Sequence, residues 1–302
     1  RQMGSEVVVA LRGGDPDGVL SRLSDLEARW SRFRDDSEVV RAGATPHPVV
    51  VSDETALLVE CAVSAWRATG GRFDPTVVDA MEALGYDRDL DAVLAAAPPV
   101  DLGPRTAPGC ADVVVDRTTG LVHLPGALRI DAGGIGKGLA ADLAATEAVA
   151  DGAQGALVSI GGDVRVAGEP PSGGWALGVE HAGVTTARVQ LDDGALVTSS
   201  TLRRSWTTTS SVVHHVVDPR TGRPTDGPAV AVSVVAGEAW WAEAVATAVL
   251  VGFGQQDETD LAALFDSCGV LVTTDDGARH VLGAFGNAFD LVDAPSPVVG
   301  VG

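Results

Sequence analysis

The sequence has little of several residue types, and each shortage excludes a class of protein. Only one lysine occurs among 21 basic residues in 302 positions, while 41 residues are acidic, which gives a formal net charge of −20. A chain this acidic is repelled by nucleic-acid phosphates and by anionic lipid. No apolar run approaches the roughly 18 residues that a membrane-spanning helix needs. We therefore expect no nucleic-acid partner and no membrane span.

Cysteine is scarce as well. Cys61, Cys110 and Cys268 stand far apart, without the Cys-x-x-Cys spacing typical of zinc sites or redox motifs. We predict that they are small buried side chains rather than disulfide partners or zinc ligands. Aromatic residues make up only 4% of the chain, but hydrophobic residues make up 45%. That content supports a folded core and argues against a disordered chain.

The hydrophobic pattern predicts helices and short strands in mixed order. The expected helices span residues 18–33, 52–69, 79–84, 139–150, 239–251 and 259–267. The expected strands span 7–11, 112–116, 121–124, 127–131, 156–160, 163–167, 175–180, 187–191, 195–198, 212–217, 229–236 and 269–274. This mixture predicts an α+β fold, with mixed, largely antiparallel sheets and packed helices.

One segment suggests a division of the chain. Residues 96–109 carry four prolines, which disfavour regular structure and mark a seam. We predict an N-terminal α/β portion, residues 1–110, and a strand-rich portion, residues 111–302, which together form one catalytic unit. The tail from residue 294 is expected to be loosely ordered.

A glycine-rich segment at 131–138 holds the only lysine, Lys137, between a predicted strand and a predicted helix. Glycines let backbone N–H groups approach an anion, and the N-terminus of the following helix adds positive potential. The segment is not a P-loop, because Gly138 stands where a magnesium-binding Ser or Thr would be, and Leu139 breaks a dinucleotide fingerprint. Spacing alone leaves two readings, an anion site or a tight turn with a solvated lysine.

Two further motifs carry polar groups that suit catalysis. A predicted strand delivers His215 to an Asp-Pro-Arg-Thr-Gly turn, where the imidazole either accepts a proton or simply lies beside a capped turn. On a predicted helix, Glu243 and Thr247 are four residues apart and share one face. Two hard oxygen ligands of this kind suit Mg²⁺, although such a pair is most often a solvated face. Because this helix is otherwise apolar, Glu243 is expected to be buried and to need a partner.

Taken in order, the motifs resemble the FAD:protein FMN transferases of the ApbE family, over about residues 3–275. Met3-Gly4-Ser5 resembles the family's opening Met-Gly-Thr, and residues 31–38 resemble its Ser-x-Phe-x-x-x-Ser-Glu helix end. The other matching segments are 71–77, 131–138, 158–163, 215–222 and 242–247. The Ala- and Gly-rich composition is most similar to that of actinobacterial members.

The resemblance implies Mg²⁺-dependent transfer of FMN from FAD, through a phosphoester bond, to a Thr or Ser of an acceptor protein, with release of AMP. The residues that it implies for contacting FAD are Met3, Phe73, Asp74, Asp131, Lys137 and Val217. Those that it implies for holding Mg²⁺ are the carbonyl of Gly134 together with Glu243 and Thr247. His215 is our candidate base, and Glu243 is counted with it as catalytic through the metal.

Three departures from the family pattern stand out. Glu243 replaces an aspartate that is common at the metal position and is one methylene longer. Ala42 and Gly43 replace a Leu-Asn pair, which removes a polar side chain that could contact the flavin. The segment from Gly283 onward matches nothing in the family pattern.

Other functions remain open at this level. Hydrolysis of the FAD pyrophosphate to FMN and AMP needs the same site, with water as the nucleophile. A flavin-binding protein without catalysis and an acidic α+β domain without flavin affinity are the remaining alternatives. The acidity and the lack of a visible leader predict a cytoplasmic protein; a leader ahead of residue 1 would instead make it exported and membrane-anchored.

Overall fold

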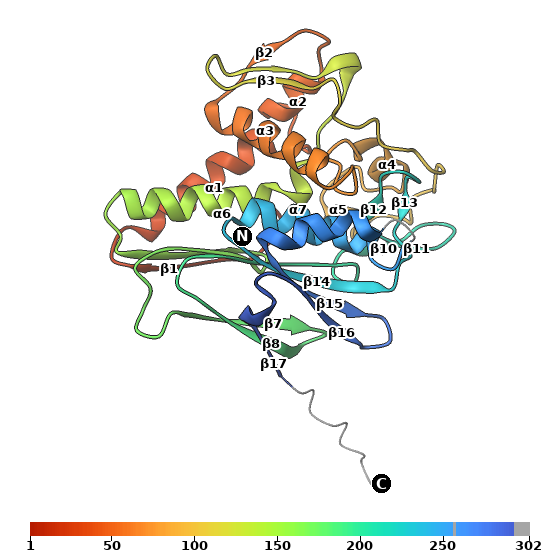
Figure 1. The fold of residues 1–302 in the computed structure, drawn as a ribbon. Helices are drawn as coiled ribbons and strands as arrows, with labels where there is room; N and C mark the ends of the chain where they lie inside the picture. Colours follow the sequence, from red (N-terminus) through yellow and green to blue (C-terminus); the bar gives the residue numbers. More distant parts are fainter. Residues whose placement is uncertain (256–257, 293–302) are drawn as a thin grey trace.

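A seven-stranded antiparallel sheet forms the centre of the molecule in the computed structural model, which describes residues 1–255 and 258–292 (Figure 1). Its strands, in spatial order, are β1 (Val7–Arg12), β5 (Gly155–Ile160), β6 (Asp163–Gly168), β9 (Gly194–Ser200), β14 (Ala229–Ala236), β15 (Gly269–Thr274) and β16 (Arg279–Gly283). Val7 pairs with Ile160 and Arg12 with Gly155, so a strand from the first residues closes one edge of the sheet. The two predicted portions therefore share this sheet, and the boundary near residue 110 stays a prediction.

A smaller sheet covers one face of the main sheet. It consists of β7 (Trp175–His181), β8 (Val184–Leu191) and β17 (Phe289–Leu291), in the order β17-β8-β7. Apolar side chains from both sheets, among them Val166, Leu271, Val189 and Phe289, fill the space between them. Because helices cover the other face, every residue of β15 is buried, and β14 is buried at all but one position.

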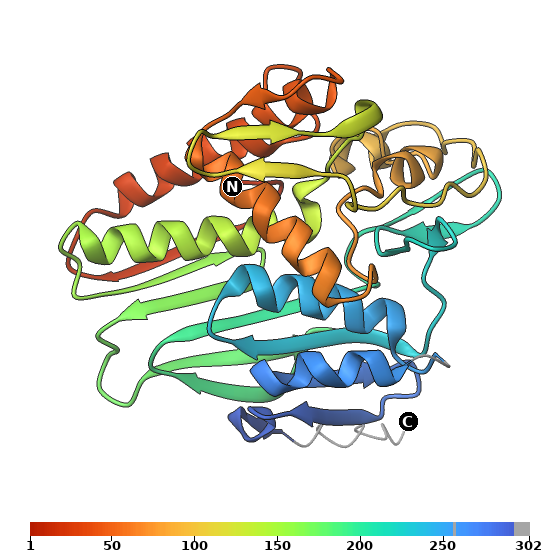
Figure 2. The ribbon, with the colours of Figure 1, turned by 45° about the horizontal axis from the view of Figure 1, so that its top comes forward.

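Helices form the layer on the opposite face, as the two ribbon views show (Figures 1 and 2). They are α1 (Pro16–Trp30), α3 (Asp53–Ala68), α6 (Gly136–Ala150) and α7 (Ala239–Gly252). In α1 the buried residues Val19, Leu23, Leu26 and Trp30 follow the helical spacing that the sequence predicts. The two helices α6 and α7, rich in alanine, lie directly on the main sheet and join the largest hydrophobic cluster.

Short elements complete the fold around the helical layer. They are α2 (Glu38–Gly43), α4 (Val78–Ala83), α5 (Leu90–Ala95), β2 (Val49–Val50), β3 (Val114–Asp116), β4 (Leu121–His123), β10 (Ser205–Thr207), β11 (Val212–His214), β12 (Val217–Asp218) and β13 (Arg223–Pro224). Single 3₁₀ segments lie at Pro125–Ala127, Ala132–Gly134, Glu258–Ser267 and Gly286–Ala288. A third apolar cluster, with Met81, Tyr86, Trp206 and Val217, ties α4 to the strands β10–β12.

The structure confirms the α+β class with antiparallel sheets and corrects three details. The strand expected at 127–131 is absent, because Pro125–Ala127 forms a 3₁₀ turn and Ala127 has a φ of +60°. The strand expected at 212–217 is split, because the chain changes partners at His215 from β10 to β13. The segment 259–267 is 3₁₀ rather than α. The tail expected from 294 lies outside the described residues.

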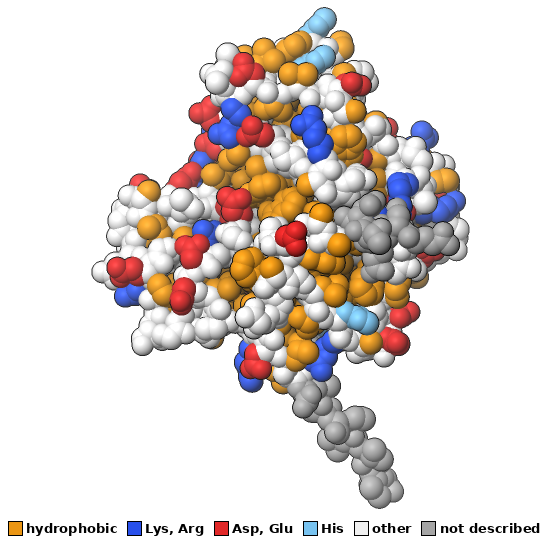
Figure 3. All heavy atoms as spheres, viewed as in Figure 1, with side chains coloured by type: hydrophobic (Ala, Val, Ile, Leu, Met, Phe, Trp, Pro, Cys, Tyr) orange, Lys and Arg blue, Asp and Glu red, His pale blue; other side chains and the backbone are white. Residues whose placement is uncertain are grey.

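The surface and the cysteines agree with the composition. Charged side chains of both signs are scattered around the face seen in Figure 3, and hydrophobic side chains gather over the helices at its centre. Cys61, Cys110 and Cys268 are buried free thiols, as predicted, and burial raises the pKa of each to about 12. Within the described ranges, the helices are all too short or too polar to cross a bilayer.

The absence of a side chain at Gly138 lets α6 and α7 approach closely. A Cβ added there would lie 2.4 Å from the carbonyl oxygen of Ala239, at the first residue of α7. Asp142, one turn further along α6, accepts hydrogen bonds of 2.9 Å from the backbone N–H groups of Ala239 and Trp240. Residue 138 therefore sets the distance between these two helices.

We expect Gly138→Ala to lower the free energy of unfolding by roughly 1–3 kcal/mol, because the added methyl group forces the two backbones apart. Gly237→Ala is the matched control, since a Cβ there meets nothing within 4 Å and its φ is ordinary. Guanidinium denaturation of both variants measures the difference. Equal stability of the two variants would contradict the close packing of α6 on α7.

Candidate active site

All ten residues that the sequence singles out line one cleft, although they come from separate parts of the chain. The cleft has a volume of about 1070 Å³, at the upper end of the range for small-molecule sites, and suits a ligand of dinucleotide size. The ten are Met3, Phe73, Asp74, Asp131, Gly134, Lys137, His215, Val217, Glu243 and Thr247. The fold thus brings the N-terminal segment, the glycine loop, the β11–β12 junction and α7 together.

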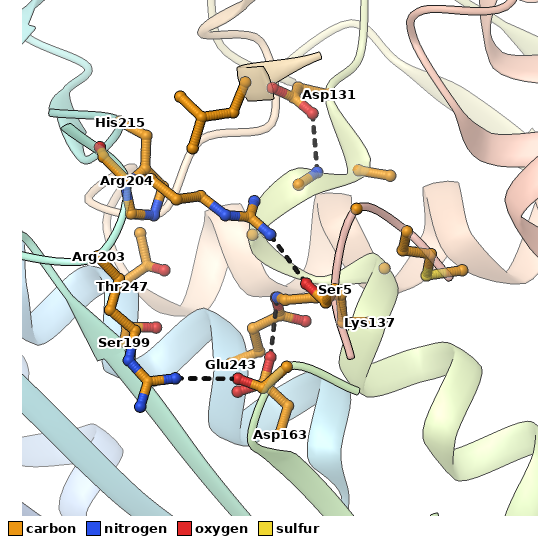
Figure 4. Close-up of a pocket in the computed structure, with 18 of the residues that line it drawn as sticks. Ser5, Asp131, Lys137, Asp163, Ser199, Arg203, Arg204, His215, Glu243 and Thr247 are labelled. Atoms are coloured by element: carbon orange, nitrogen blue, oxygen red, sulfur yellow. Dashed lines mark hydrogen bonds and ion pairs between the residues drawn. The ribbon is translucent and has the colours of Figure 1, made fainter. Parts of the chain in front are cut away.

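Lys137 lies between two acids at the floor of the cleft (Figure 4). Its Nζ is 2.8 Å from Oδ2 of Asp163 and also forms an ion pair with Oε1 of Glu243. The second oxygen of Glu243 accepts a 2.8 Å hydrogen bond from the backbone N–H of Gly138, in the first turn of α6. The expectation that a buried Glu243 needs a partner is therefore met by two partners.

The charges of this triad, Lys137 with Asp163 and Glu243, control its protonation. Burial by itself would lower the pKa of Lys137, but the two carboxylates outweigh burial and keep that pKa above its ordinary value. Burial raises the pKa of Glu243 to about 7, and the charge of Lys137 opposes that rise. With both acids ionised, the triad has one more negative than positive group. Lys137 stays protonated, and its positive charge is offset by the two carboxylates within the protein.

The metal ligands that the resemblance implies are compatible with the structure. Thr247 lies on α7 one turn from Glu243, and its hydroxyl makes no hydrogen bond to any described residue. A Cβ added at Gly134 would lie 3.7 Å from that hydroxyl oxygen, so the glycine turn adjoins Thr247. Among the described residues, no three or more His, Cys, Asp or Glu side chains are grouped so that they could hold a metal ion by themselves. One carboxylate with two neutral oxygens nevertheless suits Mg²⁺, which keeps waters and substrate oxygens in its shell.

His215 lies at the junction of β11 and β12, with its ring oriented by the backbone. The ring Nδ1 of His215 is 3.3 Å from the carbonyl oxygen of Arg204, and the backbone N–H of His215 also donates to that oxygen, at 3.1 Å. Because a carbonyl only accepts, Nδ1 carries the proton and Nε2 of the neutral ring is an acceptor. Burial, together with the charges of Arg204 and Lys137, lowers the pKa of His215 to about 3.

Asp131 and Asp74 are both engaged by the protein. Asp131 accepts a 2.8 Å hydrogen bond from the N–H of Gly133 and forms a 3.1 Å ion pair with Arg32. Asp74 accepts from the N–H of Thr76 at 2.8 Å and from the indole of Trp66 at 3.1 Å. Burial raises the pKa of Asp74, and the hydrogen bonds from Thr76 and Trp66 counter part of this rise. Both acids therefore shape the walls of the cleft through the turns that they hold.

The remaining predicted residues supply apolar wall. Phe73 and Val217 are buried, and Met3 has the unusual φ of +50° in a tight turn that places it against the main core. The departure at Ala42 and Gly43 lies elsewhere. Both residues are buried outside the cleft, and a Cβ on Gly43 would lie 3.0 Å from the carbonyl oxygen of Leu128.

Sequence reasoning gave no role to several polar residues of the cleft, four of which matter below. Asp163 was part of a recognised motif but received no role, and Ser5, Arg203 and Arg204 received none either. The adjacent arginines gave no signal because nearly every basic residue in this chain is arginine. A carboxylate that follows two glycines at a strand junction was the available signal for Asp163.

The ApbE family profile matches residues 3–271 of this chain. A FAD:protein FMN transferase of Rhodobacter capsulatus is 34% identical over 76% of this chain, which spans only 46% of that protein's length. One of Vibrio cholerae is 26% identical over 85% of this chain and 79% of its own. The crystal structure of the ApbE protein of Thermotoga maritima superposes with a TM-score of 0.80 at 25% identity, covering 95% of this chain and 96% of that one.

The profile match extends over most of the chain, and the superposition extends over nearly all of it. The matched range includes the glycine loop, the His215 junction and the helix that carries Glu243 and Thr247. The chain therefore belongs to the ApbE family.

Proposed function

We propose that this protein transfers FMN from FAD to a Thr or Ser hydroxyl of an acceptor protein and releases AMP. The observation that carries the proposal is the convergence, in one cleft of dinucleotide size, of a neutral histidine and a carboxylate–hydroxyl pair from α7. The names of the relatives in Rhodobacter and Vibrio support the same reaction.

His215 supplies the base in this proposal. The acceptor hydroxyl gives its proton to Nε2 of His215 while its oxygen forms a bond to the phosphorus of the FMN half. The bond from that phosphorus to the bridging oxygen breaks, and the bridging oxygen leaves with AMP. The carbonyl of Arg204 keeps the proton on Nδ1, so that Nε2 has a free lone pair to accept the proton of the hydroxyl.

Gly134, Glu243 and Thr247 are the residues that would hold Mg²⁺, which when bound supplies positive charge beside the diphosphate. Lys137 and the N–H of Gly138 fix the Glu243 carboxylate in place. A carboxylate has about four lone-pair sites, so these two partners leave capacity for a further ligand.

The proposal is tested by mixing the protein, FAD and Mg²⁺ with an acceptor domain that carries the motif Asp-Gly-x-Ser-Gly-Ala-Thr. We expect a covalently bound, fluorescent flavin on the acceptor and an equal amount of AMP. An acceptor with the final Thr replaced by Val is the control. AMP and FMN formed at the same rate without acceptor would identify a FAD pyrophosphatase instead, and FAD binding without any AMP would identify a non-catalytic flavin protein.

His215→Gln is expected to slow transfer by roughly 10²–10⁴-fold, the usual contribution of a general base, with FAD affinity nearly unchanged.

Because the pKa of His215 is about 3 in the free protein, the imidazole is unprotonated at neutral pH. The profile of kcat/KM for FAD should therefore show no rise near pH 6.5 that belongs to His215, and a rise near pH 7 caused by ionisation of Glu243 should persist in His215→Gln. The negative charge of a bound diphosphate raises the pKa of His215. Because kcat reports the complex and kcat/KM the free protein, the rise in kcat that belongs to His215 should lie at higher pH than the rise in kcat/KM. Identical profiles for the two constants would contradict this role.

Glu243→Gln should greatly raise the Mg²⁺ concentration needed for half-maximal transfer and leave FAD binding mostly intact, because it removes one charge from the metal shell while keeping nearly the same shape. Glu243→Asp should retain part of the activity. Glu238→Gln is the matched control, since Glu238 precedes the same helix and bonds only to the indole of Trp240 among the described side chains. Wild-type transfer by Glu243→Gln at limiting Mg²⁺ would remove Glu243 from the metal site.

A further inference from the structure

The basic residues of the cleft differ in whether an acid already neutralises them. Arg1 is 3.0 Å from Asp91, Arg32 is 3.1 Å from Asp131, and Lys137 contacts two carboxylates. Arg203 and Arg204 also line the cleft, and neither forms an ion pair with any described acid. Their positive charges are therefore available to a ligand.

Arg204 is the better placed of the two. Its side chain crosses the cleft in the close-up, and Nη2 donates a 3.2 Å hydrogen bond to the hydroxyl of Ser5 on the opposite wall (Figure 4). It is half-buried, whereas Arg203 is exposed and donates to the carbonyl oxygen of Gly161 at 3.3 Å. A partly desolvated charge interacts more strongly with an anion than an exposed one.

The wall opposite Arg204 is built to receive it. Gly161 has a φ of +66°, and a Cβ there would lie 2.9 Å from the hydroxyl oxygen of Ser5. The glycine therefore makes room for Ser5, and Ser5 holds the guanidinium of Arg204 across the cleft. One neutral hydrogen bond leaves several of the five N–H donors of Arg204 free for a ligand.

The charge balance at the floor of the cleft favours a role for this arginine. FAD carries a negative charge on each of its two phosphates, whereas the positive charge of Lys137 is offset by its contacts with Asp163 and Glu243. The triad therefore attracts a diphosphate less than an unpaired cation would. The guanidinium of Arg204 carries a positive charge that no acid offsets among the described residues, and its fork of N–H donors matches phosphate oxygens.

We infer that Arg204 binds the diphosphate of FAD and holds it beside His215, whose ring is oriented by the carbonyl of the same residue 204. This inference rests on the proposed function in taking FAD as the ligand. It makes Arg204 the residue that distinguishes a phosphorylated flavin from riboflavin. The proximity of the Arg204 charge to the imidazole, which helps to lower the pKa of His215, agrees with this placement.

The test compares the affinity of FAD with that of riboflavin, which has no phosphate, by quenching of flavin fluorescence, with Mg²⁺ and again with EDTA. Arg204→Gln should weaken FAD binding by roughly tenfold to a hundredfold, the range for losing a charge-assisted hydrogen bond, and leave riboflavin binding within about twofold. Arg204→Lys should recover part of the loss. Arg117→Gln is the control for charge, because exposed Arg117 pairs with Glu60 outside the cleft.

Each result decides the inference. Equal losses for FAD and riboflavin would mean that Arg204 only supports the cleft, and a phosphate-selective loss in Arg203→Gln but not in Arg204→Gln would transfer the role to Arg203. Failure of the wild-type protein to bind FAD would overturn this inference and the proposed function together. If the wild-type protein binds FAD but transfers nothing, the proposed transfer fails, and the binding ratio of the two ligands still decides the role of Arg204.

Discussion

The ion pairs of Lys137 with Glu243 and Asp163 connect the three elements on which the cleft is built. Lys137 is in the first turn of α6, Glu243 is on α7 and Asp163 begins β6. Removing Lys137 would leave two buried carboxylates without their cation, and an uncompensated buried charge typically costs about 3–5 kcal/mol. The chain therefore uses its only lysine where the sheet and both central helices meet, and this junction is also the floor of the cleft.

The same junction explains why the chemistry of the cleft is divided among several groups. Because Lys137 pairs with Glu243 and Asp163, it fixes the position of Glu243, and its implied contact with FAD stays a prediction. We place further positive charge for a diphosphate on Arg204, on the opposite side of the cleft. In these proposals the metal-binding acid, Glu243, and the anion-binding arginine, Arg204, are kept apart, so that neither charge cancels the other before a ligand arrives.

Much of the site could be predicted from the sequence, since apolar periodicity located the long helices and the resemblance to the ApbE family, carried by ordered motifs, implied the residues that line the cleft. Glu243 shows why this worked: a carboxylate on an otherwise apolar helix demands a buried partner. Arg204 shows where it failed, because its significance depends on the absence of a nearby acid, which only the folded chain reveals. The strand expected at 127–131 failed for a local reason, since Pro125 and Gly126 begin a 3₁₀ turn. Short elements such as α2, α5 and β13 lack enough residues to show a period.

The glutamate that replaces the family's usual aspartate fits this structure for a geometric reason. Gly138 has no side chain, so the N-terminus of α6 comes close to α7, and the N–H of Gly138 donates to the Glu243 carboxylate. The positive end of α6 stabilises the anion, as it would a bound phosphate. One oxygen of Glu243 thus accepts a hydrogen bond from Gly138, and the other pairs with Lys137. Thr247 lies one turn further along the same helix. The extra methylene and the missing side chain at residue 138 are consequently two parts of one arrangement, in which the packing of α6 on α7 also holds the acid that the chemistry needs.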